Sequence, residues 1–241
     1  MLRVIYILVI GSIFLIIMNT GMAAAKKVAL ITGATDGIGQ FTADLLAASS
    51  YRVLIHGRSH ERIENTGKKL RSKTPNADVI LLKPHDLSSI QHTKSFAKHV
   101  LETLGDAGKL DLLINNAGVF TASDSRILTE DGLEMTFAVN VVAPYILFTM
   151  LMPLLKNTPE SRVINVSSIS QGGRILDENF FPLETSKSSS KEYFTSHAAY
   201  SHSKLCIAAL NQELSQRITA EDSLCLSCDP GTVNTKMLLA G

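Results

Sequence analysis

The sequence lacks an excess of charge of either sign and lacks any long run of basic residues. Its 241 residues include 23 Lys and Arg against 22 Asp and Glu, which gives a formal net charge of +1. No basic cluster is longer than two consecutive residues. Proteins that bind nucleic acid normally carry a basic face, so we expect no nucleic-acid partner.

Cysteine is scarce, and the histidines do not have metal-ligand spacing. The three cysteines, Cys206, Cys225 and Cys228, are too few for a disulfide framework in a chain of this length. Cys225 and Cys228 lie in an apolar run typical of a strand, where residues three apart point to opposite faces. This placement disfavours joint metal ligation, and we expect no metal site.

The common dinucleotide fingerprint G-x-G-x-x-G is absent, and a different glycine spacing stands in its place. Residues 32–39 read TGATDGIG, follow an apolar stretch and precede a helical pattern. A strand, a glycine turn and a helix present backbone N–H groups and a helix N-terminus to a phosphate. Gly33 permits the turn, Gly37 permits close approach of a pyrophosphate, and Gly39 permits close helix packing. Taken alone, the spacing also fits an ordinary strand-turn-helix.

Apolar runs and helical patterns alternate along the rest of the chain without a domain boundary or an internal repeat. Strands are expected at 28–31, 51–56, 79–82, 110–114, 162–166 and 223–228, and helices at 41–48, 61–73, 88–104, 133–155 and 196–218. Short, continuously apolar strands separated by helices indicate a parallel sheet covered on both faces. The expected fold is an α/β doubly wound sheet in which six strands can be recognised from the sequence, forming one domain over residues 26–241.

The first 25 residues form a separate, apolar segment. Extended from residue 4 to residue 25, its apolar run covers 22 residues. A helix of that length spans about 33 Å and could cross a bilayer. Ala23 and Ala25 also fit the small-residue cleavage site of a secretory signal. We expect residues 1–25 to be a membrane anchor or a signal segment.

The ends of the expected strands carry residues that could meet a nucleotide. Ligands of a doubly wound sheet bind outside the carboxyl ends of its strands. Arg58 follows the second strand, where no carboxylate is present to accept from a ribose 2′-hydroxyl. Its planar cation suits a 2′-phosphate and favours NADP over NAD, unless it is an ordinary surface arginine. Asp86, after the third strand, could accept from the adenine amino group or cap the next helix.

A phenol and an ammonium group lie one helical turn apart at Tyr200 and Lys204. Residues four apart share one face of a helix, so the two side chains are expected to be neighbours. In isolation this pattern also fits an exposed aromatic–lysine pair. Combined with a phosphate-binding turn, it suggests hydride chemistry on a nicotinamide cofactor.

Together these motifs resemble the short-chain dehydrogenase/reductase family. The family motifs occur here in order as the glycine turn at 32–39, NNAG at 115–118, a helix asparagine at Asn140, a strand-end serine at Ser168, YxxxK from Tyr200 to Lys204, and Pro230-Gly231. The match covers residues 27–235. The stretches 128–140, 162–168 and 200–205 resemble the membrane-associated retinol dehydrogenase branch. The resemblance implies a Rossmann-like fold and NADP(H) as cofactor.

The resemblance also assigns roles to individual residues. Tyr200 would exchange a proton with the reacting oxygen, while Lys204 would lower the pKa of that phenol and hold the nicotinamide ribose. Ser168, chosen over Ser167, would hydrogen-bond the reacting oxygen, and Asn140 would position a water in the proton relay. The expected cofactor-binding residues are Gly33, Thr35, Asp36, Gly37, Ile38, Gly39, Arg58, Asp86, Leu87, Asn116, Ala117, Gly118, Tyr200, Lys204, Pro230, Gly231 and Val233.

The leading hypothesis is an oxidoreductase that transfers hydride between NADP(H) and a lipophilic alcohol or carbonyl compound, retinoid-, steroid- or lipid-like. The interval of 32 residues from Ser168 to Tyr200 predicts a substantial loop over the substrate side. Family members continue through a further helix and a seventh strand after Pro230-Gly231, so we expect the C-terminal end of the fold to be truncated. The alternative is therefore a catalytically impaired nucleotide-binding scaffold or regulatory protein.

The N-terminal segment and the resemblance together predict where the protein acts. We expect attachment to the endoplasmic reticulum membrane through residues 1–25, with the catalytic domain facing the cytosol. The alternative is a secreted or luminal protein after signal cleavage. A homodimer is left open as a further partner.

Overall fold

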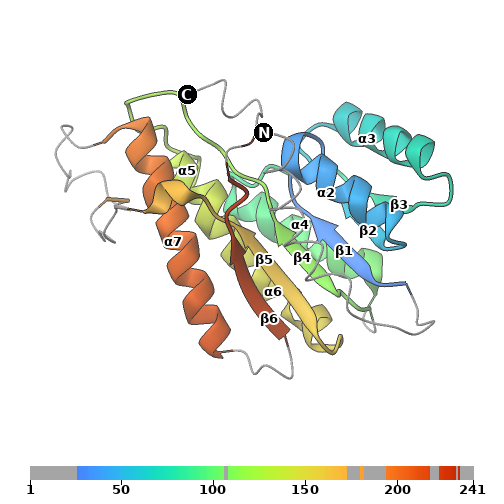
Figure 1. Ribbon diagram of the computed structural model, residues 1–241. Helices are drawn as coiled ribbons and strands as arrows, with labels where there is room; N and C mark the ends of the chain where they lie inside the picture. The colour runs from blue at the N-terminus through green and yellow to red at the C-terminus, as the bar shows by residue number, and fades with distance from the viewer. Residues whose placement is uncertain are drawn as a thin grey trace.

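A six-stranded parallel sheet with strand order β3-β2-β1-β4-β5-β6 organises the chain (Figure 1). The computed structural model describes residues 26–105, 108–172, 180–181, 194–217, 223–231 and 233. The strands are β1 (Val28–Ile31), β2 (Arg52–Ile55), β3 (Asp78–Leu81), β4 (Leu112–Asn115), β5 (Ser161–Val166) and β6 (Ser223–Cys228). Every neighbouring pair in this order is parallel. The predicted α/β doubly wound, Rossmann-like fold is confirmed, and its order reverses between β1 and β4.

Helices connect the strands and cover both faces of the sheet. They are α2 (Gly37–Ala48), α3 (His60–Lys73), α4 (Ile90–Leu104), α5 (Met135–Phe137), α6 (Ala143–Lys156) and α7 (Ser196–Arg217), with short η1 (Ala138–Val142) and η2 (Ile169–Gln171) segments. The first helix begins at Gly37, four residues earlier than expected, because Asp36 caps it by accepting a hydrogen bond from the Gly37 N–H. The cap of α4 is Ser89, whose side chain accepts from the His92 N–H.

Two hydrophobic clusters lie on opposite faces of the sheet, because alternate strand residues point in opposite directions. Leu30 belongs to the cluster that includes residues of α4, α6 and α7, whereas Ile31 belongs to the cluster with α2 and α3. Cys225 lies in the first cluster and Cys228 packs against the second. The expectation that these two thiols face opposite ways is confirmed.

The single long helix expected over 133–155 is interrupted. A π-helical segment, η1, lies between α5 and α6, and Asn140 is at its centre. Such π-bulges in α-helices are frequent at functional sites, and sequence periodicity does not reveal them. Taken together, α5, η1 and α6 form one helical stretch, Met135–Lys156. Within the described ranges it is the one helix that is apolar and long enough to cross a membrane. Its side chains Leu147, Leu151 and Leu154 are buried in the hydrophobic cluster that contains Leu30, which is the environment of a core helix.

Two predicted features lie outside the described residues. They are the N-terminal segment 1–25 and most of the loop expected between Ser168 and Tyr200.

Candidate active site

A cleft of about 730 Å³ runs along the carboxyl ends of the strands. Its wall contains residues that directly follow β1, β2 and β4, the last residue of β5, and side chains of α7. This is the edge of the sheet at which a doubly wound fold binds ligands, beside the reversal between β1 and β4. A cleft of this volume is in the range that holds a cofactor-sized ligand.

The glycine turn forms one part of the cleft and is held against the loop after β4. Gly33 and Gly37 have φ angles of 64° and 51°, a region that favours glycine. A Cβ at Gly33 would lie 3.0 Å from Ala117 Cα, and a Cβ at Gly39 would lie 2.3 Å from the Gly33 carbonyl oxygen. Gly33 and Gly39 therefore allow the turn to pack closely against protein backbone, and Gly33 and Gly37 line the cleft whereas Gly39 does not.

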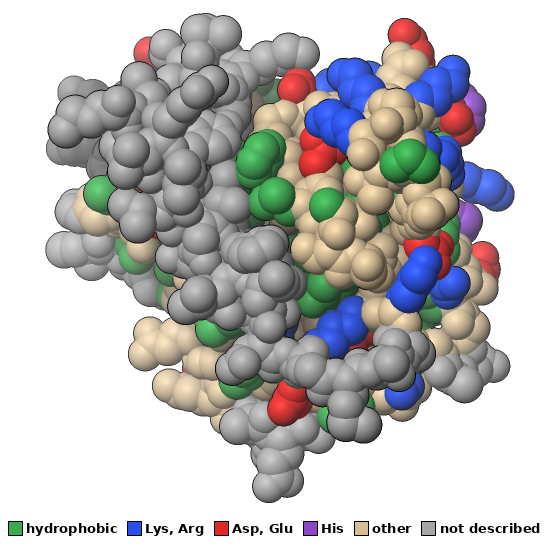
Figure 2. Space-filling model, turned by 45° about the vertical axis from the view of Figure 1, so that its right-hand side comes forward, with side chains coloured by type: hydrophobic (Ala, Val, Ile, Leu, Met, Phe, Trp, Pro, Cys, Tyr) green, Lys and Arg blue, Asp and Glu red, His purple; other side chains and the backbone are tan. Residues whose placement is uncertain are grey.

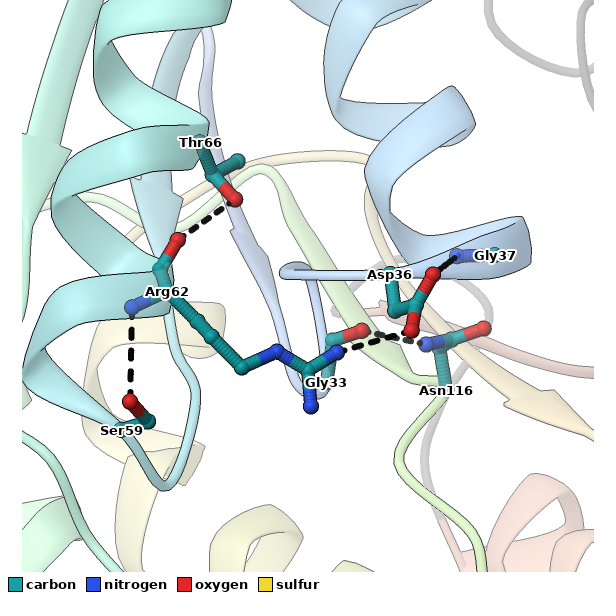
Figure 3. Close-up of polar contacts among 7 residues, drawn as sticks. All are labelled: Gly33, Asp36, Gly37, Ser59, Arg62, Thr66 and Asn116. Carbon is teal, nitrogen blue, oxygen red and sulfur yellow. Dashed lines mark hydrogen bonds and ion pairs between the residues drawn. The ribbon is translucent and has the colours of Figure 1, made fainter. Parts of the chain in front are cut away.

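Asn116 holds the glycine turn in place, a role that the NNAG motif at 115–118 did not reveal. Its side-chain amide donates to the Thr32 carbonyl oxygen at 2.9 Å. It also donates to the Gly33 carbonyl oxygen at 3.2 Å (Figure 3). The Thr32 hydroxyl in turn accepts from the N–H groups of Asn116 and Ala117, both at 3.0 Å. Asn116 lines the cleft and also fixes the glycine turn to β4.

His56 is a cleft residue to which the sequence analysis gave no role. Its Nδ1 accepts from the Gly33 N–H at 3.3 Å, and its Nε2 contacts the His85 carbonyl oxygen at 3.2 Å. This arrangement requires a neutral ring with its proton on Nε2. Burial lowers the pKa of His56 to about 4, so the ring is neutral near pH 7. The sequence feature that could have indicated this role is a histidine at the end of an apolar strand.

The β2–α3 side of the cleft carries two arginines and one carboxylate. Arg58 lines the cleft as expected, and so does Arg62, which the sequence analysis missed. Arg62 Nη2 lies 2.8 Å from Asp36 Oδ2, and the two side chains point toward each other (Figure 3). Asp86 lines the cleft and accepts from the Ser88 N–H at 3.0 Å, but the cap of the next helix is Ser89 and not Asp86.

Tyr200 and Lys204 meet on α7 at the β5 side of the cleft. Lys204 Nζ lies 5.4 Å from the Tyr200 ring centroid and donates to the Val166 carbonyl oxygen at 2.7 Å. Burial raises the pKa of Tyr200, while a hydrogen bond with Ser168 acts in the opposite direction. Burial lowers the pKa of Lys204 to about 8. The pKa of Tyr200 is therefore raised, not lowered as expected from Lys204, because desolvation of the phenol is the largest cause.

The two serines after β5 differ in their partners. Ser167 lines the cleft, but its hydroxyl donates to Gln171 Oε1 at 2.8 Å and to the Lys204 carbonyl oxygen at 3.3 Å. Ser168 caps η2 and is hydrogen-bonded to Tyr200. The Ser168 hydroxyl therefore lies beside the phenol, although Ser168 does not line the cleft and its hydroxyl also accepts from the Ser170 N–H at 3.3 Å and the Ser170 hydroxyl at 3.0 Å.

Asn140 is a structural clamp in this arrangement rather than a group that faces the cleft. Its Oδ1 accepts from the Val119 N–H at 2.8 Å, and its Nδ2 donates to the Val119 carbonyl oxygen and to Ser203 Oγ. Both amide N–H groups are thereby used by protein partners, and the expected role of Asn140 in positioning a water stays a prediction. The clamp ties the loop after β4 to α7.

The remaining expected residues divide into two groups. Thr35, Ile38, Leu87, Ala117, Gly118 and Pro230 line the cleft, but Gly231 and Val233 do not. Gly231 donates its N–H to Asp229 Oδ1 at 2.9 Å. Among the residues that the structure describes, no group of three or more His, Cys, Asp or Glu side chains could hold a metal ion.

Comparisons with known proteins agree with this geometry. The family model described as short chain dehydrogenase matches residues 27–177. Human retinol dehydrogenase 11 is 36% identical over 213 residues, covering 88% of this chain and 63% of that protein. Human retinol dehydrogenase 13 is 33% identical over 211 residues, covering 88% of this chain and 60% of that protein. The chain thus spans about three fifths of the length of these relatives.

Solved structures show the same fold. A short chain dehydrogenase from Shigella flexneri complexed with NADP superposes with a TM-score of 0.66 at 21% identity, covering 88% of this chain and 79% of that one. A short chain dehydrogenase/reductase from Burkholderia phymatum in complex with NAD superposes with a TM-score of 0.67 at 23% identity, covering 91% of this chain and 70% of that one. The family match extends over more than half of the chain, and the curated relatives are retinol dehydrogenases. This protein therefore belongs to the short-chain dehydrogenase/reductase family and resembles its retinol dehydrogenase branch.

Proposed function

We propose that this protein is an NADP(H)-dependent oxidoreductase that interconverts a lipophilic alcohol and the corresponding carbonyl compound. The observation that carries the proposal is the arrangement of one cleft. Tyr200 and Lys204 line its β5 side, with Ser168 hydrogen-bonded to Tyr200, while the glycine turn and Arg58 lie at its β1 and β2 side. An extended dinucleotide would reach both groups.

The residues present fit a nicotinamide dinucleotide. The N-terminus of α2 and the backbone of the glycine turn would hold the pyrophosphate, and Arg58 would pair with a ribose 2′-phosphate. A Cβ at Gly118 would lie 3.3 Å from Asn140 Oδ1 and 3.7 Å from Lys204 Nζ, so glycine leaves room for a ligand beside the lysine. When bound, the cofactor supplies or accepts the hydride.

Tyr200 is the proposed proton donor and acceptor. In carbonyl reduction its hydroxyl would protonate the developing alkoxide, and in alcohol oxidation the phenolate would take the proton back. Burial raises the pKa of Tyr200, so the phenol keeps its proton at neutral pH, the form that reduction requires. Ser168 would donate a hydrogen bond to the reacting oxygen, and the Lys204 ammonium would stabilise the phenolate.

Apolar side chains near Tyr200 support a lipophilic substrate. The Phe120 ring lies 5.7 Å from the Tyr200 ring, and Phe120 and Val119 both line the cleft. Ile169, the residue after Ser168, is 76% exposed. Such side chains favour retinoid-, steroid- or lipid-like compounds, consistent with the names of the relatives.

Purified protein would be assayed for NADPH oxidation with a panel of aldehydes and ketones. Tyr200→Phe should lower turnover by about 10²-fold or more while NADPH binding is kept. Tyr145→Phe removes a phenol that is 49% exposed on α6, outside the cleft, and should leave turnover unchanged. Full activity of Tyr200→Phe would contradict the assignment, and NADPH binding without turnover of any compound would favour the scaffold alternative.

We also propose that residues 1–25 anchor a catalytic domain of residues 26–241 to the endoplasmic reticulum membrane, facing the cytosol. A substrate that partitions into the bilayer would then be delivered to the enzyme. Carbonate extraction of cell membranes, with mass spectrometry of the first residue, tests the anchor. A soluble protein beginning at Lys26 would instead establish signal cleavage.

A further inference from the structure

The β2–α3 side of the cleft holds an ion pair between two residues that both line it. Arg62, in the first turn of α3, reaches Asp36, which caps α2, with a separation of 2.8 Å between Nη2 and Oδ2 (Figure 3). The two side chains are 49% and 43% exposed. An ion pair this exposed is weakly held, so a stronger anion can take the arginine from the carboxylate.

Asp36 places a negative charge where the fold would otherwise favour an external anion. Its Oδ1 accepts from the Gly37 N–H at 2.9 Å, at the N-terminus of the helix that follows the glycine turn. The positive end of the helix dipole stabilises this carboxylate, but the same carboxylate repels a phosphate nearby. Arg62 offsets this repulsion because it pairs with the Asp36 carboxylate.

Arg58 and Arg62 line the same cleft, one directly after β2 and the other in the first turn of α3. Lys and Arg side chains are numerous on this side of the molecule, as Figure 2 shows. A phosphate monoester carries a charge of about −1.5 to −2 at pH 7, which a single guanidinium does not neutralise. Two guanidinium groups match it, and both can donate several N–H groups to its oxygens.

We infer that Arg62 is a second specificity-determining cation for the ribose 2′-phosphate, and that Asp36 competes with that phosphate for it. In the structure Arg62 is paired with Asp36. A 2′-phosphate binds by drawing Arg62 away from Asp36 toward Arg58, so Asp36 lowers the affinity for NADP. This inference rests on the proposed NADP-dependent function and adds the residues that set its selectivity.

The chain offers substitutions that separate charge from structure. Asp36→Asn keeps an oxygen that can accept from the Gly37 N–H, because asparagine caps helices as well as aspartate does, but removes the competing charge. Arg62→Gln removes the cation, while the Arg62 backbone still donates to Ser59 Oγ and accepts from Thr66 Oγ1. Lys69→Gln is the matched control: it removes one charge from an exposed position of α3 outside the cleft.

The experiment measures binding of 2′,5′-ADP and 5′-AMP by calorimetry, together with NADPH and NADH, on purified full-length protein. Arg62→Gln should weaken 2′,5′-ADP and NADPH by about 10-fold and leave 5′-AMP and NADH unchanged, as expected for a lost charge-assisted hydrogen bond. Asp36→Asn should tighten 2′,5′-ADP by about threefold, the scale of an exposed charge pair. Lys69→Gln should change none of these affinities.

The double variant Asp36→Asn/Arg62→Gln tests the competition directly. If Asp36 acts by occupying Arg62, removing its charge should produce no tightening once Arg62 is gone. Equal weakening of NADPH and NADH by Arg62→Gln, or full tightening by Asp36→Asn in the double variant, would overturn the inference. Failure of the proposed function looks different: the wild-type protein would then bind 5′-AMP as tightly as 2′,5′-ADP, and Arg58→Gln would not change that ratio.

Discussion

The hydrogen bond from the glycine turn to His56 predicts a specific dependence of stability on pH. His56 is 1% exposed, accepts from the Gly33 N–H through Nδ1, and contacts the His85 carbonyl through Nε2. Burial lowers its pKa to about 4 from 6.5. The charged or titratable groups that act on it are His85, Asp86 and Arg58. Protonation would remove the acceptor at Nδ1 and place a charge in the core.

The size of the effect follows from the two pKa values. Between pH 6.5 and about 4 the unfolded chain binds a proton at this residue and the folded chain does not, so the free energy of unfolding decreases as pH falls. Each unit of difference in pKa corresponds to about 1.4 kcal/mol, so His56 should account for a loss of about 2.5 kcal/mol between pH 7.5 and 4.5.

The assay is urea unfolding at a series of pH values, followed by circular dichroism because the chain contains no tryptophan. His56→Asn is the matched variant, since its side-chain oxygen can still accept from the Gly33 N–H and does not titrate in this range. The comparison concerns the slopes of the stability curves and not the absolute stability at pH 7.5. Stability curves of wild type and His56→Asn that run parallel from pH 7.5 to 4.5 would refute the reasoning.

Three substitutions, with Ser167→Ala as a matched control, test the proposed catalytic groups. Tyr200→Phe removes the transferable proton and should lower turnover by about 10²-fold or more with NADPH affinity kept, as steady-state kinetics and calorimetry would show. Lys204→Met should weaken both NADPH binding and turnover, because its ammonium would serve the ribose and the phenolate; a loss of turnover alone would contradict the ribose role. Ser168→Ala should lower kcat by about 10²-fold, the scale of one oxyanion donor, whereas Ser167→Ala should mainly lower the melting temperature; the opposite pattern would exchange the two assignments.

The elements of this fold were largely predictable, because strand and helix periodicities are local properties of the chain. The expected strands 28–31 and 223–228 coincide with β1 and β6, and the other four differ from expectation by one or two residues at their ends. The cleft residues that belong to sequence motifs, such as Gly33, Arg58 and Tyr200, were also found. A motif identifies such residues because neighbours in sequence form a strand, a turn and a helix in fixed order.

Other parts of the site depend on contacts between distant segments. The partners of Asn140 are 21 and 63 residues away, and the pairing of Arg62 with Asp36 joins residues 26 apart. The choice between Ser167 and Ser168 likewise depends on α7, which contributes the Lys204 carbonyl to one and Tyr200 to the other. No local pattern carries this information.

The sequence by itself therefore determined the order of elements, the glycine turn, and the presence of a tyrosine and a lysine on one helix face. Only the tertiary structure decided which polar groups bond to protein and which face the cleft: His56 supports the glycine turn, Asn140 clamps Val119, and Arg62 pairs with Asp36. The physical reason is that hydrogen bonds and burial depend on distances across the fold. Parallel strands bring segments from β1, β2, β4 and β5 to one edge, and their partners are set there.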